Sequence, residues 1–267
     1  MKDSKAIIPT LLEQVRKRRP VVHAITNWVT GGDVANALQA LGARPVLAVS
    51  PEETADITAQ ADALLLNMGT PDRDRIEAMV RSGRKANELG KPVVFDPVGA
   101  GASGFREEVC RRILKELRLT VIRGNRAEIG SLAGQGGHLR GIDAVTGPDD
   151  LAKAGRILSQ QTGAVVMASG EKDLLAYGDK VLTWEIGHPL LTRVTGTGCL
   201  LSAVIAAFTA VGQDPLAATA AGITCFKLAG RMAGEHAAGP GTFKTALLDF
   251  LYLLTPEDLG GSPDLRG

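Results

Sequence analysis

The chain has 267 residues, 45% of them hydrophobic, which is enough for one α/β domain with a substantial core. Its 30 Lys and Arg residues nearly balance its 29 Asp and Glu residues, so no net charge would hold the protein on nucleic acid or on a membrane surface. Three scattered cysteines without metal-ligand spacing suit a reduced, cytoplasmic protein better than a disulfide scaffold. We therefore expect a cytoplasmic protein that acts on small molecules.

The N-terminal segment mixes charged and apolar residues up to Arg19, which predicts an amphipathic helix. Beyond it, short runs of β-forming residues alternate with helical patterns. This alternation predicts an α/β fold with a mostly parallel central sheet and helices on both faces. Strands are expected over residues 20–25, 44–49, 63–67, 92–96, 119–122 and 164–168, and helices over 33–41, 52–60, 72–88, 107–116, 126–132 and 148–161.

The last third of the chain is expected to be helical, because the strand pattern stops near Thr197. A nearly apolar run there is too short to span a bilayer and predicts a buried helix. No linker is visible, which favours a single domain over residues 1–267. A hairpin over 174–177 and 181–185, turning at 178–180, is expected at a sheet edge, followed by helices over 199–211, 215–236 and 242–253.

Unusual stretches lie where predicted strands end or the helical third begins: Thr26-Asn27 and residues 96–104, 123–128 and 195–199. Ligands of open α/β sheets bind at the edge where strands lead into helices. We therefore expect these four stretches to form one site.

The turn from Thr195 to Cys199 contains Gly196 and Gly198 and opens a helix. Unpaired backbone N–H groups at such a turn form an anion hole suited to a transferring phosphate, although a tight turn without a ligand is the alternative. We expect the helix N-terminus to lower the pKa of Cys199, so that its thiol acts as a weak base or orients a hydroxyl. The alternative for Cys199 is a small buried residue at the helix start.

Two acidic residues indicate a divalent cation. Asp96 ends an apolar strand, and Glu128 lies in the first turn of the helix that follows the next strand. Beside nucleotide phosphates, such carboxylates hold Mg²⁺, usually through water. The alternatives are a turn former at Asp96 and a capping box in which Asn125 caps the helix and Glu128 reaches back to its backbone.

Three further residues at strand ends are candidates for binding substrates. Arg123 offers a planar guanidinium that suits phosphate oxygens, with an exposed surface Arg as the alternative. Ser169 could place a hydroxyl near a nucleotide or could form an ordinary turn. Asn27 could orient a substrate through its amide, or could form an Asx turn that ends its strand.

Two common nucleotide-binding motifs do not explain these residues. No Gly-Lys-Ser/Thr follows a glycine-rich loop, which excludes a P-loop kinase. Residues 99–104 match the dinucleotide fingerprint, but the next strand leads into Arg123 and not into an acid that would hold a ribose. A flexible glycine turn is the other interpretation of that segment.

Taken together, four segments resemble the hydroxyethylthiazole kinases of the ribokinase-like superfamily, and the similarity covers nearly the whole chain. The resemblance implies ATP- and Mg²⁺-dependent phosphorylation of the primary hydroxyl of 4-methyl-5-(2-hydroxyethyl)thiazole for thiamine salvage. It also implies a homotrimer with active sites between subunits. The four segments are residues 23–30, 95–102, 125–128 (Asn-Arg-Ala-Glu) and 195–199 (Thr-Gly-Thr-Gly-Cys).

The resemblance also implies roles for individual residues. Cys199 stands where the superfamily usually has a catalytic Asp, and Gly196 and Gly198 belong to the same catalytic turn. Asn27 and Leu47 match residues near the thiazole, which Gly196 also contacts. Leu47 replaces a common Met, and Ser169 replaces a common Thr, so both bear on fine specificity. The implied ATP-binding residues are Arg123, Asn125, Ser169 and Thr195, and the metal-associated acids are Asp96 and Glu128.

Other functions are open to the same superfamily. A pyrimidine kinase and a nucleotide-dependent dehydratase that repairs hydrated nicotinamide cofactors are alternatives, and the segment 23–30 argues against both. A non-catalytic nucleotide-binding sensor is a third alternative, because Cys199 replaces the usual acid.

Overall fold

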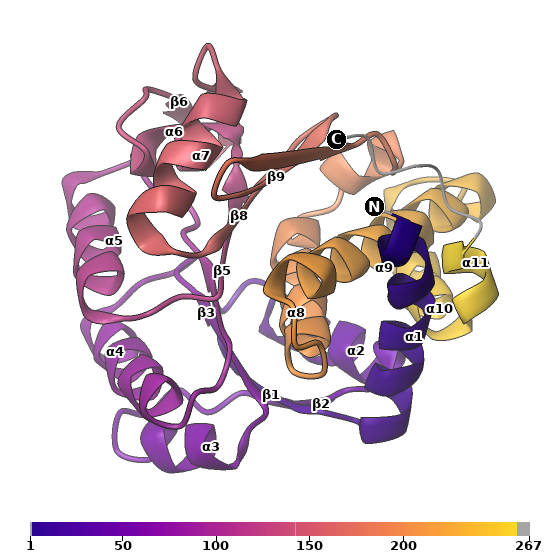
Figure 1. The fold of residues 1–267 in the computed structure, drawn as a ribbon, viewed down its shortest axis with the longest axis horizontal. Helices are drawn as coiled ribbons and strands as arrows, with labels where there is room; N and C mark the ends of the chain where they lie inside the picture. The colour runs from indigo at the N-terminus through magenta and orange to yellow at the C-terminus, as the bar shows by residue number, and fades with distance from the viewer. Residues whose placement is uncertain (1, 142, 261–267) are drawn as a thin grey trace.

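An eight-stranded sheet lies at the centre of the computed structural model, which describes residues 2–141 and 143–260 (Figure 1). The strand order is β10-β9-β8-β5-β4-β3-β1-β2. All neighbours from β8 to β2 pair in parallel, and β9 is antiparallel to both β8 and β10, so the mostly parallel sheet is confirmed. The strands are β1 (Val21–Ile25), β2 (Arg44–Val46), β3 (Ala63–Asn67), β4 (Val93–Asp96), β5 (Val121–Asn125), β8 (Val165–Ser169), β9 (Asp173–Tyr177) and β10 (Lys180–Trp184).

Helices cover both faces of this sheet, as predicted (Figure 1). On one face lie α3 (Thr54–Gln60), α4 (Arg73–Glu88), α5 (Gly104–Glu116), α6 (Arg126–Leu132) and α7 (Leu151–Thr162). On the other lie α1 (Lys2–Arg18), α2 (Gly31–Leu41), α8 (Thr197–Thr209), α9 (Pro215–His236), α10 (Pro240–Leu253) and the short α11 (Pro256–Gly260). A single 3₁₀ turn, η1 (Pro189–Thr192), precedes α8, and the described chain after it is helical. Among the described residues, no helix combines the length and apolar character needed to cross a membrane.

Alternate residues of the central strands pack into two separate cores. In β3, Leu64 and Leu66 belong to the core under α4 and α5, whereas Ala63 and Leu65 belong to the core under α8. Both sets are buried, because helices exclude water from each face of a parallel sheet. Successive side chains of a strand point to opposite faces of the sheet, and here both faces are buried. Polar residues that form a site are therefore expected at the ends of these strands.

The structure extends the fifth predicted strand at its carboxyl end. We expected residues 119–122, but β5 runs from Val121 to Asn125, because its parallel ladder with β8 continues until Asn125 lies opposite Ser169. Arg123 is consequently held inside a strand and not in a mobile loop. At the sheet edge, β2 is shorter than predicted: beyond it, the Ala48 carbonyl accepts a hydrogen bond from the His23 ring at 2.8 Å.

The hairpin at the other edge turns more tightly than we predicted. Lys180 pairs directly with Tyr177, so the turn contains only Gly178 and Asp179, and Gly178 takes a left-handed φ of 55°. A second hairpin, β6 (His138–Arg140) and β7 (Asp143–Thr146), was not predicted. Its strands of three and four residues are too short to show a clear sequence period.

Candidate active site

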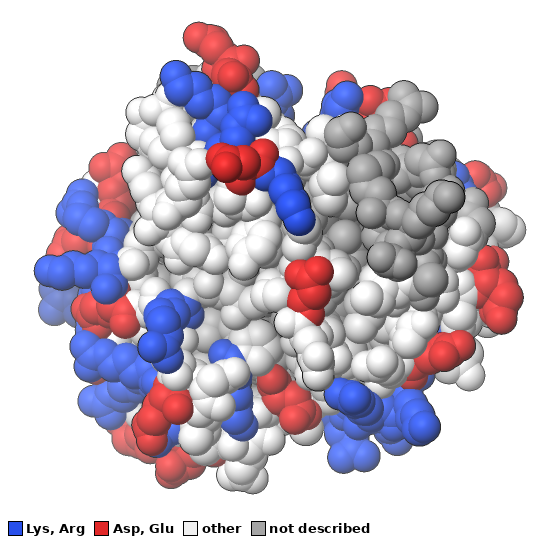
Figure 2. All heavy atoms as spheres, in the orientation of Figure 1, with Lys and Arg blue, Asp and Glu red and all other residues white. Residues whose placement is uncertain are grey.

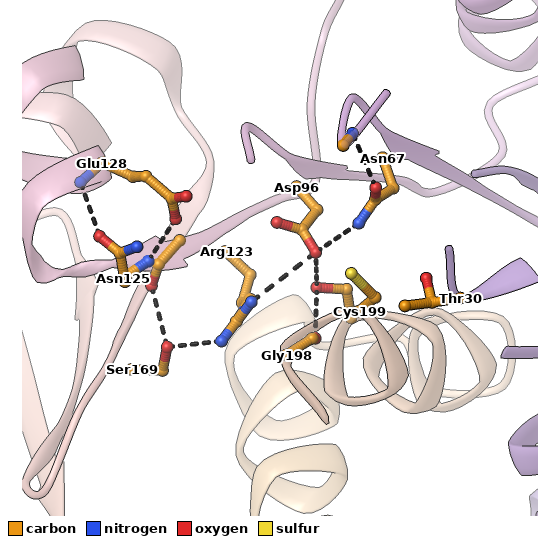
Figure 3. Close-up of polar contacts among 12 residues, drawn as sticks. Thr30, Asn67, Asp96, Arg123, Asn125, Glu128, Ser169, Gly198 and Cys199 are labelled. Carbon is orange, nitrogen blue, oxygen red and sulfur yellow. Dashed lines mark hydrogen bonds and ion pairs between the residues drawn. The ribbon is translucent and has the colours of Figure 1, made fainter. Parts of the chain in front are cut away.

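The ends of β3, β4, β5 and β8 and the start of α8 meet at one edge of the sheet (Figure 3). β4 ends in Asp96, β5 in Asn125 and β8 in Ser169, while α8 packs across β1, β3 and β4. The four stretches that we predicted to form one site do lie together, since Asn27 contacts Cys199, Arg123 faces Asp96 and Glu128 accepts from Gly99.

Asp96 is a fully buried carboxylate whose two oxygens have different surroundings. Asn67 Nδ2 and Ser202 Oγ each donate a hydrogen bond to Asp96 Oδ2 at 2.8 Å, and an Arg123 nitrogen lies 3.7 Å from the same oxygen. Asp96 Oδ1 has no hydrogen-bond partner among the described residues. Burial raises the pKa of Asp96, and the Arg123 charge opposes that shift. One oxygen is thus anchored, and the other is left for a ligand.

Cys199 lies in the first turn of α8 beside Asp96 (Figure 3). Its thiol is buried, and the Nδ2 group of Asn27 lies 3.5 Å from Sγ. Burial, followed by the negative charge of Asp96, raises the pKa of Cys199. Our expectation of a lowered pKa was therefore wrong, because desolvation and the neighbouring carboxylate outweigh the helix N-terminus.

Asn27 has no hydrogen-bonding capacity left over. Its Oδ1 accepts from the backbone N–H groups of Val29 and Thr30 at 3.0 Å and from the Thr30 hydroxyl at 3.1 Å. Its Nδ2 donates to Asn67 Oδ1 at 2.8 Å and toward the Cys199 sulfur. The amide forms the Asx turn that was our alternative, and at the same time it holds the thiol.

Arg123 lies across the N-terminus of α8, where the guanidinium links two strand ends. One terminal nitrogen donates to Ser169 Oγ at 2.5 Å, and the other faces Asp96. A Cβ atom at Gly198 would come within 2.5 Å of this guanidinium, so only glycine lets the helix approach so closely. The exposed surface Arg of our alternative is excluded, because Arg123 is 8% exposed.

Glu128 and Asn125 form the capping box that we weighed as an alternative. Asn125 Oδ1 accepts from the Glu128 N–H at 2.9 Å, while Glu128 accepts from the N–H groups of Asn125 at 2.6 Å and Gly99 at 2.8 Å. Burial, and next the charge of Asp96, raises the pKa of Glu128 to about 7. The glycine loop that mimics a dinucleotide motif is thus tied to this carboxylate through Gly99.

The turn before α8 has the backbone geometry that its glycines indicate. Gly196 caps the helix with a left-handed φ of 89°, and a Cβ there would meet the Thr30 methyl group at 2.2 Å. The first N–H groups of a helix have no partner within the helix, so those of α8 are available to an anion. Thr195 is exposed just before this turn.

The outer edge of the site is apolar. Leu47 is 38% exposed and lies near Gly31 and Thr26, while Trp28 and Val29 are 74% and 64% exposed. The Trp28 ring stacks on the guanidinium of Arg75, 4.3 Å from the ring centre. Large exposed apolar side chains next to polar site residues suit a substrate or a protein surface.

Several residues that hold the site together were missed in the sequence. Asn67 follows four apolar residues at the end of β3, which is the same signal that identified Asp96. Ser202 lies three residues after Cys199 on the same helix face. The buried pair of Lys227 and Asp173, 2.9 Å apart, joins α9 to β9 and has no local sequence signal.

A pocket of about 380 Å³ opens at Gly170, the residue that follows Ser169. It lies between the turn that leads from β8 to β9, the segment around η1, and α9. Asp173 Oδ1 accepts from the Gly170 N–H at 3.0 Å and so fixes the turn that forms one wall. Lining residues include Gly170, Glu171, Gly187, Leu191, Thr192 and Lys227.

This sheet order, with helices on both faces and a glycine turn opening a buried helix beside a strand-end acid, defines a ribokinase-like protein. A solved ribokinase-like superfamily protein from Enterococcus faecalis V583 has a TM-score of 0.64 and 16% identity over 93% of this chain and 95% of that chain, a likeness of fold alone. The chain belongs to the hydroxyethylthiazole kinase family, whose model matches residues 12–257.

Individual relatives agree with this family. A hydroxyethylthiazole kinase of Chloroflexus aggregans is 47% identical over 252 residues, which cover 94% of this chain and 91% of the relative. The solved structure of a hydroxyethylthiazole kinase protein from Pyrococcus horikoshii OT3 has a TM-score of 0.89 and 39% identity, covering 98% of both chains. The resemblance stated from the sequence is thereby confirmed.

Proposed function

We propose that this protein transfers the γ-phosphoryl group of ATP to the primary hydroxyl of 4-methyl-5-(2-hydroxyethyl)thiazole, giving the thiazole phosphate used in thiamine salvage. The observation that carries the proposal is the position of Cys199 in a chain of this family. Its thiol lies at the start of α8, among Asp96, Arg123 and the N–H groups of a glycine turn. This arrangement supplies an alcohol-binding group and an anion site side by side.

The residues present fit Mg²⁺ carried by nucleotide phosphates. Asp96 Oδ1 is a buried oxygen without a partner in the described chain, which is unusual unless a ligand completes it. The described residues hold no cluster of three or more metal-ligating acids, histidines or cysteines, so the protein offers few ligands. Mg²⁺ keeps several waters and binds through one or two carboxylates plus phosphates. Asp96 and, through water, Glu128 would hold it, and the ion would neutralise phosphate charge.

The transfer step needs positioning more than strong acid or base chemistry. The alcohol oxygen forms a bond to the γ-phosphorus as the bond to the β,γ-bridging oxygen breaks; ADP leaves, and the hydroxyl proton passes late to an oxygen of the transferred phosphoryl group and from there to water. Arg123 and the first N–H groups of α8 stabilise the negative charge on the transferring oxygens. A thiol whose pKa is raised stays protonated near neutral pH, which favours Cys199 as a group that orients the hydroxyl.

The two substrates would approach from opposite sides of Arg123. The thiazole ring would lie against Leu47 and Gly196, in the apolar outer edge of the site. The nucleotide would follow Arg123, Asn125, Ser169 and Thr195 toward the pocket beside η1. We infer that the chain works as one kinase domain over residues 1–267, in the cytoplasm, as a homotrimer whose subunits close the thiazole site.

A phosphotransfer assay tests the function directly. Purified protein with Mg-ATP is expected to convert the thiazole alcohol to its phosphate, measured by mass spectrometry and by ADP release. A pyrimidine alcohol and a hydrated nicotinamide cofactor, assayed in competition, test the two enzyme alternatives. Calorimetric binding of ATP without any product would support the sensor instead and would reject the kinase.

A further inference from the structure

The fully buried side chain of Asn67 contacts both halves of the site. It extends from the end of β3 toward Asp96 (Figure 3), and its oxygen accepts a hydrogen bond from Asn27. Asn27 in turn contacts the Cys199 sulfur. A short chain of hydrogen bonds therefore connects the candidate metal-binding carboxylate to the candidate hydroxyl-orienting thiol.

Backbone N–H groups fix which amide atoms donate and which accept along this chain of hydrogen bonds. The Gly69 N–H can only donate, and it faces Asn67 Oδ1 at 3.0 Å, so Asn67 Nδ2 must face Asp96. The N–H groups of Val29 and Thr30 fix the Asn27 amide in the same way. Both amides therefore have one allowed orientation, and each donates toward a site group.

This orientation has a consequence for each end of the chain. At Asp96, Asn67 and Ser202 take up Oδ2 and leave Oδ1 without a hydrogen-bond partner among the described residues. At Cys199, the donor from Asn27 fills a lone pair of the sulfur. If Asn67 lost its amide, Asp96 Oδ2 would keep only the Ser202 donor and the Arg123 charge, and the Asn27 amide would lose its contact with the Asn67 oxygen.

We propose that Asn67 is a positioning residue for phosphoryl transfer: its amide holds the Asp96 carboxylate and, through Asn27, the Cys199 thiol in one mutual arrangement. In this role it touches neither substrate. The inference rests on the proposed kinase activity, and it adds a residue that acts through its neighbours.

Kinetics of Asn67→Leu provide the first test, because leucine is similar in size and cannot form hydrogen bonds. We expect kcat to fall at least about tenfold, while KM for ATP and for the thiazole alcohol changes by less than about threefold. Asn87→Leu is the matched control, since Asn87 also donates to a carbonyl and accepts from an N–H, both of Arg118 and far from the site. A kcat unchanged by Asn67→Leu would overturn the proposal.

The reactivity of the Cys199 thiol gives a second test that does not depend on catalysis. The readout is the rate at which iodoacetamide alkylates Cys199 in the ligand-free protein, located by peptide mass spectrometry; Cys110 and Cys225 are 2% and 0% exposed. Asn67→Leu should slow alkylation at least about threefold, because the Asn67 side chain is one of those whose hydrogen bonding stabilises the Cys199 thiolate. The double variant Asn67→Asp, Asp96→Asn reinstates the hydrogen bond with reversed polarity but moves the negative charge to position 67, beside Asn27 and the sulfur, so it should alkylate no faster than Asn67→Leu.

The two tests separate failure of this inference from failure of the proposed function. If the wild-type protein phosphorylates no thiazole alcohol, the alkylation rates still show whether Asn67 positions Cys199. If the protein is an active kinase but Asn67→Leu alkylates at the wild-type rate, the positioning role is rejected. Should Asn67→Leu fail to fold, an exchange variant that alkylates as fast as the wild type rejects it instead.

Discussion

At the scale of single residues, the main chemical question is what the thiol of Cys199 does in phosphoryl transfer. Burial and the charge of Asp96 raise the pKa of its thiol, so the protein keeps the group protonated at neutral pH. A protonated thiol can orient an alcohol, and a loose phosphoryl-transfer transition state asks for little more. The raised pKa therefore argues against Cys199 as an activated nucleophile, because that role needs a thiol whose pKa is lowered.

Removing the thiol should affect turnover more than binding. We expect Cys199→Ala to lower kcat by roughly tenfold to a hundredfold, with KM for the thiazole alcohol raised less than about threefold. Steady-state kinetics with both substrates varied would measure this split. The opposite pattern, a raised KM with an unchanged kcat, would make Cys199 a binding or packing residue.

Glu128 makes the stability of the ligand-free protein depend on pH in a definite direction. Its folded-state pKa is about 7, against 4.5 for an ordinary glutamate, because of burial and the nearby Asp96. A raised carboxyl pKa contributes stability that is fully present below pH 4.5 and lost as pH rises through 7. Ionised Glu128 therefore costs stability above neutral pH, although its two backbone hydrogen bonds reduce the cost.

A comparison with Glu128→Gln isolates this effect from other titrating groups. Between pH 5.5 and pH 8, the wild-type protein should lose about 2 kcal/mol of unfolding free energy relative to the variant. Urea denaturation of both proteins without nucleotide at each pH is the measurement. Parallel pH dependence in the two proteins would show that Glu128 is already ionised at pH 5.5.

At the scale of elements, the close contact between α8 and β5 depends on one missing Cβ. Arg123 lies where a side chain at position 198 would begin, so the helix start and the guanidinium share one anion site. An alanine there suits the helix better than glycine, by up to about 1 kcal/mol. The long Arg123 side chain can move aside, so the substitution should disturb binding and not folding.

Gly198→Ala is therefore expected to leave the melting temperature within a few degrees while raising KM for ATP about tenfold, because Arg123 no longer reaches both Ser169 and the phosphate site. Differential scanning fluorimetry and ATP-dependent kinetics provide the two readings. Gly104→Ala is the matched control, since a Cβ at Gly104, in the first turn of α5, meets open space. Equal ATP affinity in both variants would contradict the shared anion site.

The elements also show where sequence reasoning succeeds and where it stops. The sheet, its flanking helices and the strand-end residues follow from apolar runs that end in single polar residues, as at Asp96. Partners that meet only through the tertiary fold, such as Lys227 with Asp173, leave no local pattern. The pKa of Cys199 could not be predicted either, because it depends on burial and on the distance to Asp96, which the helix position alone does not give.

On the scale of the whole molecule, charge is distributed without a dominant sign. Lys and Arg side chains mix with Asp and Glu around the rim of the face in Figure 2, consistent with a formal net charge of +1. Large apolar side chains are exposed at several places, such as Tyr252 and Leu253, and three of them, Trp28, Val29 and Leu47, lie next to the site. A second subunit covering these side chains would remove them from water and close the thiazole site.

The proposed homotrimer is therefore expected to depend on Trp28. Light scattering of the wild-type protein should give three times the chain mass of 27.9 kDa, and Trp28→Ser should shift the population toward monomer at micromolar concentration, because burying an indole is a large part of an interface's stability. The same variant should raise KM for the thiazole alcohol. Tyr252→Ser is the control, since Tyr252 is 69% exposed on α10. A monomeric wild-type protein with full activity would show that one subunit completes the site alone, and the apolar edge would then be a substrate surface only.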